Sequence, residues 1–144
     1  MTTEKIHEIA EELDLGFRAF IHQTSGRLLF VPDDKSNPGI EMDTWSEELE
    51  ELKKKASDYF EVEKWTSDES FEMMRAFAEQ MADPNLQSRL LNALSGNKPF
   101  RAFKSLIDNT GDPREQWFDF KGNWQRAFVE GKLKGLSENA ENGG

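Results

Sequence analysis

Three prolines divide the second half of the chain into short helices. They are Pro84, Pro99 and Pro113, and a proline at the first helical position favours a helix start because its missing N–H would have no partner there. Between them, apolar residues recur every three or four positions, which is the spacing of one buried helical face. The sequence therefore predicts a run of helices from about residue 68 to the end of the last apolar stripe at Phe128.

The inward-facing positions of these helices are rich in aromatic rings. The chain has 11 Phe, 4 Trp and 1 Tyr, too many for a disordered protein, so we expect an aromatic core. Phe118 lies off the stripe of the last helix and is expected either to meet a second packing partner or to be exposed. Gly122 is expected to break or kink that helix. The residues predicted to face inward are Phe71, Met74, Ala78 and Met81, widened by Met73 and Phe77, then Leu86, Leu90, Leu91 and Leu94, then Phe100, Phe103 and Ile107, and finally Trp117, Phe120, Trp124 and Phe128.

The first half of the chain predicts a small sheet. A hairpin is indicated by two alternating segments around a turn that ends in Gly26, a residue that tolerates the left-handed backbone of short hairpin loops. Thr3 is expected to cap the first helix. Strands are predicted at 17–23, 27–32 and 58–65, and helices at 3–13 and about 45–56.

Together these elements predict an α+β fold. Three strands alone make a weak sheet, so helices must cover it. We expect a small three-stranded antiparallel sheet, made of the hairpin plus one strand, with helices packed on it and a helical C-terminal half. Residues 1–136 are predicted to form a single domain, and the polar residues 137–144 a disordered tail.

The charge of the chain is uneven. The formal net charge is −10, yet residues 1–83 carry 21 acidic and 9 basic side chains, whereas residues 84–136 carry 5 acidic and 9 basic ones. The overall acidity argues against a general nucleic-acid binder, since phosphate binding depends on cationic surface. The basic half leaves a local binding patch possible, although attraction between the two halves is the favoured explanation of the asymmetry.

Several classes of function find no support in the residues. There is no cysteine, which excludes disulfides, thiolate metal sites and a cysteine nucleophile. His7 and His22 have no ligand spacing, and an acidic loop from Asp34 places Pro38 and Trp45 where calcium needs oxygen ligands. No nucleophile elbow or phosphate-binding loop occurs. We therefore assign no catalytic residue, cofactor or metal ligand.

The location of the protein is predicted from two further features. The first residues, MTTEKIHEIAEELD, have early acids and no apolar core, unlike a signal peptide. No apolar stretch approaches the roughly 20 residues that a membrane span needs. A cytoplasmic protein without a membrane partner is expected.

One sequence pattern does point to a binding surface. Basic residues alternate with aromatic ones in PFRAFKSLI (99–107) and PREQWFDFKGNWQRAF (113–128). Rings beside cations are used by proteins that bind single-stranded nucleic acids, but helical spacing predicts that most of these rings are core. The candidate binding residues are Arg101, Lys104 and Arg114, which would hold an anionic group, and Trp117 and Phe118, which would supply apolar contact.

The same segments carry a resemblance. GNKPFRAFK (96–104) and REQWFDF (114–120), after a hairpin with a Thr/Gly turn and a helix containing Met and Phe, resemble the bacterial uncharacterised protein family (UPF) 0158 over about residues 17–130. That family tends to carry an Asp before its hairpin turn, where this chain has His22 and Gln23, and a terminal Trp-Leu pair, where this chain has residues 130–133, EGKL. The resemblance implies a bacterial cytosolic protein and no established activity.

The leading hypothesis is a non-enzymatic binding module with a protein partner. The alternatives are a module that binds single-stranded nucleic acid, which the net charge disfavours, and an enzyme using carboxylates or Arg in a cleft between helices and sheet. A deep pocket with a carboxyl group of strongly raised pKa would favour the enzyme.

Overall fold

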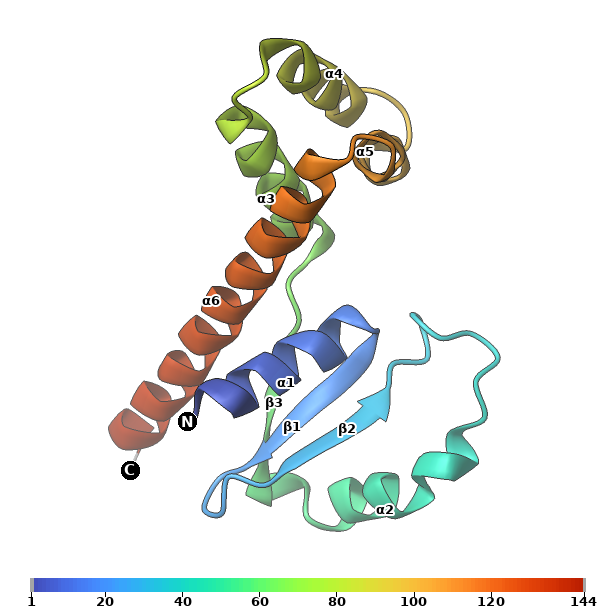
Figure 1. The fold of residues 1–144 in the computed structure, drawn as a ribbon. Helices are drawn as coiled ribbons and strands as arrows, with labels where there is room; N and C mark the ends of the chain where they lie inside the picture. Colours follow the sequence, from blue (N-terminus) through green and yellow to red (C-terminus); the bar gives the residue numbers. More distant parts are fainter. Residues whose placement is uncertain (1, 144) are drawn as a thin grey trace. The chain divides into compact units, whose positions relative to one another are not determined.

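The computed structural model describes the backbone of residues 2–143 and the side chains of residues 2–136. The predicted disordered tail, residues 137–144, lies outside the residues whose side chains are described. The elements, in chain order, are α1 (Thr3–Asp14), β1 (Phe17–His22), β2 (Leu28–Pro32), a 3-10 turn (Met42–Trp45), α2 (Ser46–Lys54), a second 3-10 turn (Ala56–Asp58), β3 (Tyr59–Val62), α3 (Ser67–Gln80), α4 (Pro84–Ser95), α5 (Pro99–Asp108) and α6 (Asp112–Gly143) (Figure 1).

The predicted α+β class is confirmed, and the chain forms two compact units. β1 pairs antiparallel with both β2 and β3, which gives the strand order β2-β1-β3. The sheet unit comprises residues 1–64 and 126–144, and the helical unit comprises residues 65–125. The boundary between Gln125 and Arg126 falls inside α6.

In the sheet unit, α1 packs against β1 (Figure 1). Its buried residues Ile9, Ala10 and Leu13 recur at helical spacing, as the sequence predicts. Thr2, and not the predicted Thr3, caps this helix, because the Thr2 hydroxyl accepts the N–H of Lys5 at 3.2 Å.

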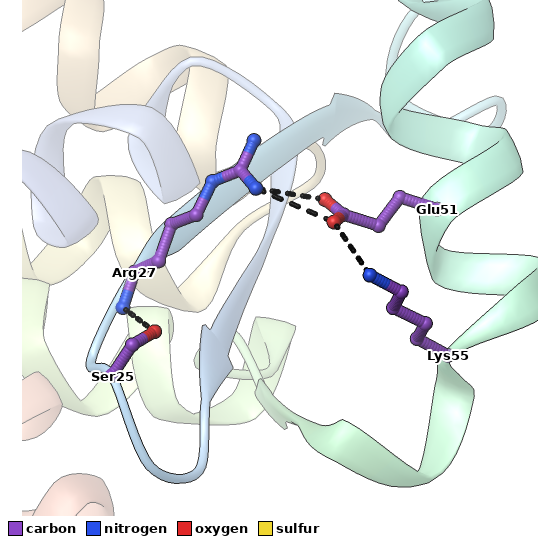
Figure 2. Close-up of polar contacts among 4 residues, drawn as sticks. All are labelled: Ser25, Arg27, Glu51 and Lys55. Atoms are coloured by element: carbon purple, nitrogen blue, oxygen red, sulfur yellow. Dashed lines mark hydrogen bonds and ion pairs between the residues drawn. The ribbon is translucent and has the colours of Figure 1, made fainter.

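A polar cluster centred on Glu51 joins α2 to the hairpin (Figure 2). Glu51 receives Arg27 Nη1 at 3.2 and 3.3 Å and Lys55 Nζ at 3.9 Å, and Ser25 Oγ accepts the backbone N–H of Arg27 at 3.2 Å. Tyr59 is buried on β3, and its burial, followed by its hydrogen bond to Glu51, raises the pKa of the phenol. One carboxylate therefore binds groups from α2, from β3 and from the residue before β2.

In the helical unit, aromatic rings form the centre of the core. Phe103 meets Phe77 at 6.3 Å and Trp117 at 5.0 Å between ring centroids, both edge-to-face, a geometry that aromatic quadrupoles favour. Thr66 and Glu69 close a capping box at the start of α3. The fully packed cluster consists of Met73, Phe77, Ala78, Leu86, Leu90, Leu94, Phe103, Ile107 and Trp117.

Two predictions about these helices are wrong. Gly122 does not break α6, which is continuous through it. A glycine in a helix costs only about 1 kcal/mol, which packing by neighbours such as Trp117 and Trp124 can offset. Phe100, predicted to be in the core, is 39% exposed. It lies at the edge of the buried arc of α5, whose centre is set by Phe103 and Ile107.

Candidate functional site

The candidate residues of α5 lie on its exposed face. Phe103 and Ile107, 0% and 1% exposed, fix one side of the helix in the core. Arg101 and Lys104 are both exposed on the other side, one turn apart. The exposed Phe100 lies one turn before Lys104 on that same side, so a ring and two cations share one surface.

The candidate residues at the start of α6 form a second exposed pair. The Arg114 guanidinium lies 5.0 Å from the centre of the Phe118 ring, a cation–π contact. Arg114 Nε also lies 3.7 Å from Asp108 Oδ1 at the end of α5, so this arginine joins the two helices. Phe118 is 47% exposed, which decides between the two positions expected for it.

Trp117 is predicted both on the inward-facing stripe of the last helix and among the candidate binding residues, and its inward position is confirmed. It is 6% exposed and contacts Phe77 and Phe103 edge-to-face, so its ring is part of the core and not of the binding surface. The reason is the helical stripe that also contains Phe120 and Trp124, because a ring on that stripe points inward. Trp117 therefore supports the exposed residues from beneath.

The uncompensated charge of this surface comes from three cations. Lys98, Arg101 and Lys104 are exposed, and none makes an ion pair or a side-chain hydrogen bond with another described residue. Lys98 is also the one non-glycine residue with positive φ (51°) among residues 2–143. Its left-handed backbone sits directly before Pro99 at the start of α5.

We call this surface the interaction strip. Its exposed rings account for two of the three large hydrophobic residues that are exposed in the part of the chain whose side chains are described, the third being Leu15 of the sheet unit. The sequence pattern missed Phe100 and Lys98, and the position of Phe100 in the first turn of a short helix is the signal that could have revealed it. The strip consists of Lys98, Phe100, Arg101, Lys104, Arg114 and Phe118.

The sheet unit contains a separate pocket of about 560 Å³. Ile21, Phe60 and Leu133 give it an apolar wall, and the hairpin turn that follows His22 lines its polar side. Within the turn, His22 Nδ1 accepts the backbone N–H of Ser25 at 3.2 Å.

One carboxyl group of the sheet unit, that of Glu12, has a raised pKa. The causes are burial first and then repulsion by Glu8 and by Glu11. Glu12 does not line the pocket, so the raised pKa and the pocket do not form one site.

Residues 2–136 contain no group of three His, Asp or Glu side chains placed to hold a metal ion. In the same part of the chain, no helix is long and apolar enough to cross a membrane.

Comparison with known proteins places the chain in a family. Residues 2–138 match the model of the Uncharacterised protein family (UPF0158), so the chain belongs to this family and the resemblance inferred from its C-terminal segments is confirmed. A relative from Pseudomonas aeruginosa, the UPF0158 protein PA5073, is 26% identical over 129 residues, which cover 88% of this chain and 78% of the relative. No solved structure matches.

Proposed function

We propose that this protein is a binding module whose interaction strip docks a partner protein in the cytoplasm. The observation that carries the proposal is that two exposed rings share the strip with three cations that have no partner among the described residues. Exposed rings and arginines are enriched where proteins bind one another, because covering them removes apolar area from water and satisfies fixed charges.

The packed core beneath the strip also favours a binding function. Phe103, Ile107 and Trp117 are 0%, 1% and 6% exposed, so α5 and the start of α6 rest on a packed core. The backbone that presents the strip is therefore already ordered before binding, which lowers the entropic cost of association.

The charges around Phe118 favour a protein over a nucleic acid. Glu115 and Asp119 are exposed beside it on α6, and Asp108 already compensates Arg114. Phosphates would be repelled at this end of the strip, while the whole chain carries a net charge of −10.

Affinity capture from lysate of a bacterium that encodes the protein tests this proposal. The double variant Arg101→Glu/Lys104→Glu is expected to lose the partner that the native protein captures, with its melting temperature unchanged to within a few degrees. Arg89→Glu is the matched control, because Arg89 is an exposed cation of α4 outside the strip. Equal capture by all three proteins would refute the proposal, and collapse of the double variant would show that Arg101 and Lys104 are structural.

The nucleic-acid alternative is tested on the same preparation. Nucleic acid bound to the strip would raise the ratio of ultraviolet absorbance at the nucleic-acid maximum to that at the protein maximum at low salt and would be removed at high salt. We expect the ratio not to change with salt and single-stranded RNA not to bind at low salt.

A further inference from the structure

We infer that the segment docked on the α5 part of the interaction strip, from Lys98 to Lys104, is acidic and carries an apolar side chain beside its carboxylates. This inference rests on the proposed function and adds the chemistry of the partner. The occupant is a short protein segment because this part of the strip has three cations around a single exposed ring, Phe100, which suits a few carboxylates and one apolar anchor.

The spacing of the cations sets the spacing of the carboxylates. Arg101 and Lys104 are one turn apart, a rise of about 4.5 Å along α5, and Lys98 begins the row about 9 Å from Lys104. Carboxylates about 5–6 Å apart, as at positions i and i+4 of a helix, or about 7 Å apart, as at i and i+2 of a strand, can each reach one of these cations.

Phe100 supplies the apolar part of the recognition. It lies one helical turn from Lys104 and next to Arg101, and 39% of it is exposed. A leucine or aromatic side chain of the partner would cover this ring while its acidic neighbours reach the cations. Since an exposed ion pair alone contributes little, apolar burial is needed for a specific complex.

The same geometry disfavours single-stranded nucleic acid as the occupant. Such binders combine a cationic groove that follows the backbone with several rings for successive bases. Here Phe100 is the only exposed ring on α5, and the second exposed ring, Phe118, has the acidic side chains Glu115 and Asp119 beside it.

The test uses synthetic probes of known composition. A fluorescein-labelled peptide of Glu residues with Leu at every fourth position is titrated with the full-length protein, and fluorescence anisotropy gives Kd. Two control peptides replace each Leu by Ala or each Glu by Gln, and a labelled oligouridine RNA is the nucleic-acid probe. We expect both control peptides to bind at least about tenfold more weakly than the parent, and the RNA not to compete with it.

Matched variants connect this binding to the strip. Phe100→Ala and Arg101→Glu/Lys104→Glu are expected to raise Kd for the parent peptide about tenfold or more. Leu15→Ala and Arg89→Glu, which remove an exposed apolar residue and an exposed cation elsewhere, should leave it unchanged. Arg101→Lys should retain most of the affinity, which separates loss of charge from loss of folding.

Each contrary result overturns the inference in a different way. Equal binding of the Ala-containing peptide would show attraction by charge alone, and tighter binding of the RNA would reassign the strip to nucleic acid. If the strip variants abolish capture from lysate but the acidic peptide does not bind, the proposed function stands and the acidic partner is wrong. If the variants change neither measurement, both proposals fail.

Discussion

The two units use their cations differently. In the sheet unit, Arg18 binds Glu61 at 2.8 Å and Arg27 binds Glu51 at 3.2 Å, so both of these arginines are matched by a carboxylate. On α5 of the helical unit, Arg101 and Lys104 have no acidic partner among the described residues.

The cores of the two units differ in residue type. The helical unit buries the rings of Phe77, Phe103 and Trp117 against one another, whereas the sheet unit buries aliphatic residues such as Ile9 and Val62 and has the polar cluster of Glu51 between α2 and its hairpin. Both units have an apolar core, and in the sheet unit Arg27 and Glu51 also join the hairpin to α2. A cation without a carboxylate partner, such as Arg101 or Lys104, remains available to bind another molecule.

The largest effect that tests this comparison is expected from the aromatic core. Phe103→Ala should lower the free energy of unfolding by about 3–5 kcal/mol, because it removes a fully buried ring that contacts Phe77 and Trp117. Urea unfolding followed by tryptophan fluorescence measures the loss. Phe118→Ala, the same change at an exposed ring, should cost less than about 1 kcal/mol. Equal losses would mean that exposure does not separate core from strip.

The next effect concerns the polar cluster of the sheet unit. Glu51→Gln should cost about 1–2 kcal/mol, because it weakens the contacts to Arg27, Lys55 and the buried Tyr59 together. Thermal unfolding measures the change. Glu50→Gln is the control, because among the described side chains Glu50 pairs with Lys54 alone and both are largely exposed, so a cost of about 0.5 kcal/mol or less is expected. A control as destabilised as the variant would remove the special role of the cluster.

The polar cluster of Glu51 also predicts how the stability of the sheet unit depends on pH. Tyr59 is the only tyrosine of the chain, so the phenolate absorbance reports it alone. Its pKa is raised above the ordinary 10.0, so the folded state holds this proton more tightly than the unfolded state. Its contribution to stability is therefore complete below pH 10 and is lost as pH rises through the raised value. Glu51→Gln should lower the titration midpoint, because the hydrogen bond to Glu51 and the charge of Glu51 both raise the pKa of Tyr59.

A smaller effect is expected at Lys98, where stability and binding should change in opposite directions. Lys98→Gly relieves the left-handed backbone at φ 51° and should stabilise the protein by about 0.5–1 kcal/mol, while weakening binding of the acidic peptide. Lys98→Ala removes the same charge but keeps a Cβ, so it should weaken binding without the gain in melting temperature. A gain of equal size in both variants would contradict backbone strain as the cause.

The sequence predicted most elements of both units for physical reasons. Apolar spacing identified the helices, and Leu86, Leu90 and Leu94 are buried as that spacing predicts. The hairpin and the third strand pair as expected from alternation, with Ala19 opposite both Phe30 and Val62. These patterns are local, so helices and strands can be predicted from them without knowing which elements pack together.

The candidate site was harder to predict, because exposure depends on neighbouring elements. Phe100 and Trp117 both fit a helical stripe, yet Phe100 lies beyond the reach of the core and Trp117 lies within it. The left-handed backbone of Lys98 is set by the connection between α4 and α5, and no residue preference indicates it. Arg101 and Lys104 are predicted from the alternation of basic and aromatic residues, and their lack of partners among the described residues is visible only in the structure.

The smallest effect is expected at Glu12 in α1 of the acidic sheet unit. Glu12 has a raised pKa, first because of burial and then because Glu8 and Glu11 repel its charge, so its ionised form opposes folding. Glu12→Gln should therefore raise the free energy of unfolding at neutral pH by about 0.2–0.5 kcal/mol. The gain should vanish below the ordinary pKa of 4.5, where Glu12 is protonated in both states. Glu11→Gln should give a smaller gain, because Glu11 repels Glu12 but also contacts His7 at 2.8 Å. Thermal melts of both variants at neutral and acidic pH measure the difference, and equal gains would show that only total charge matters in α1.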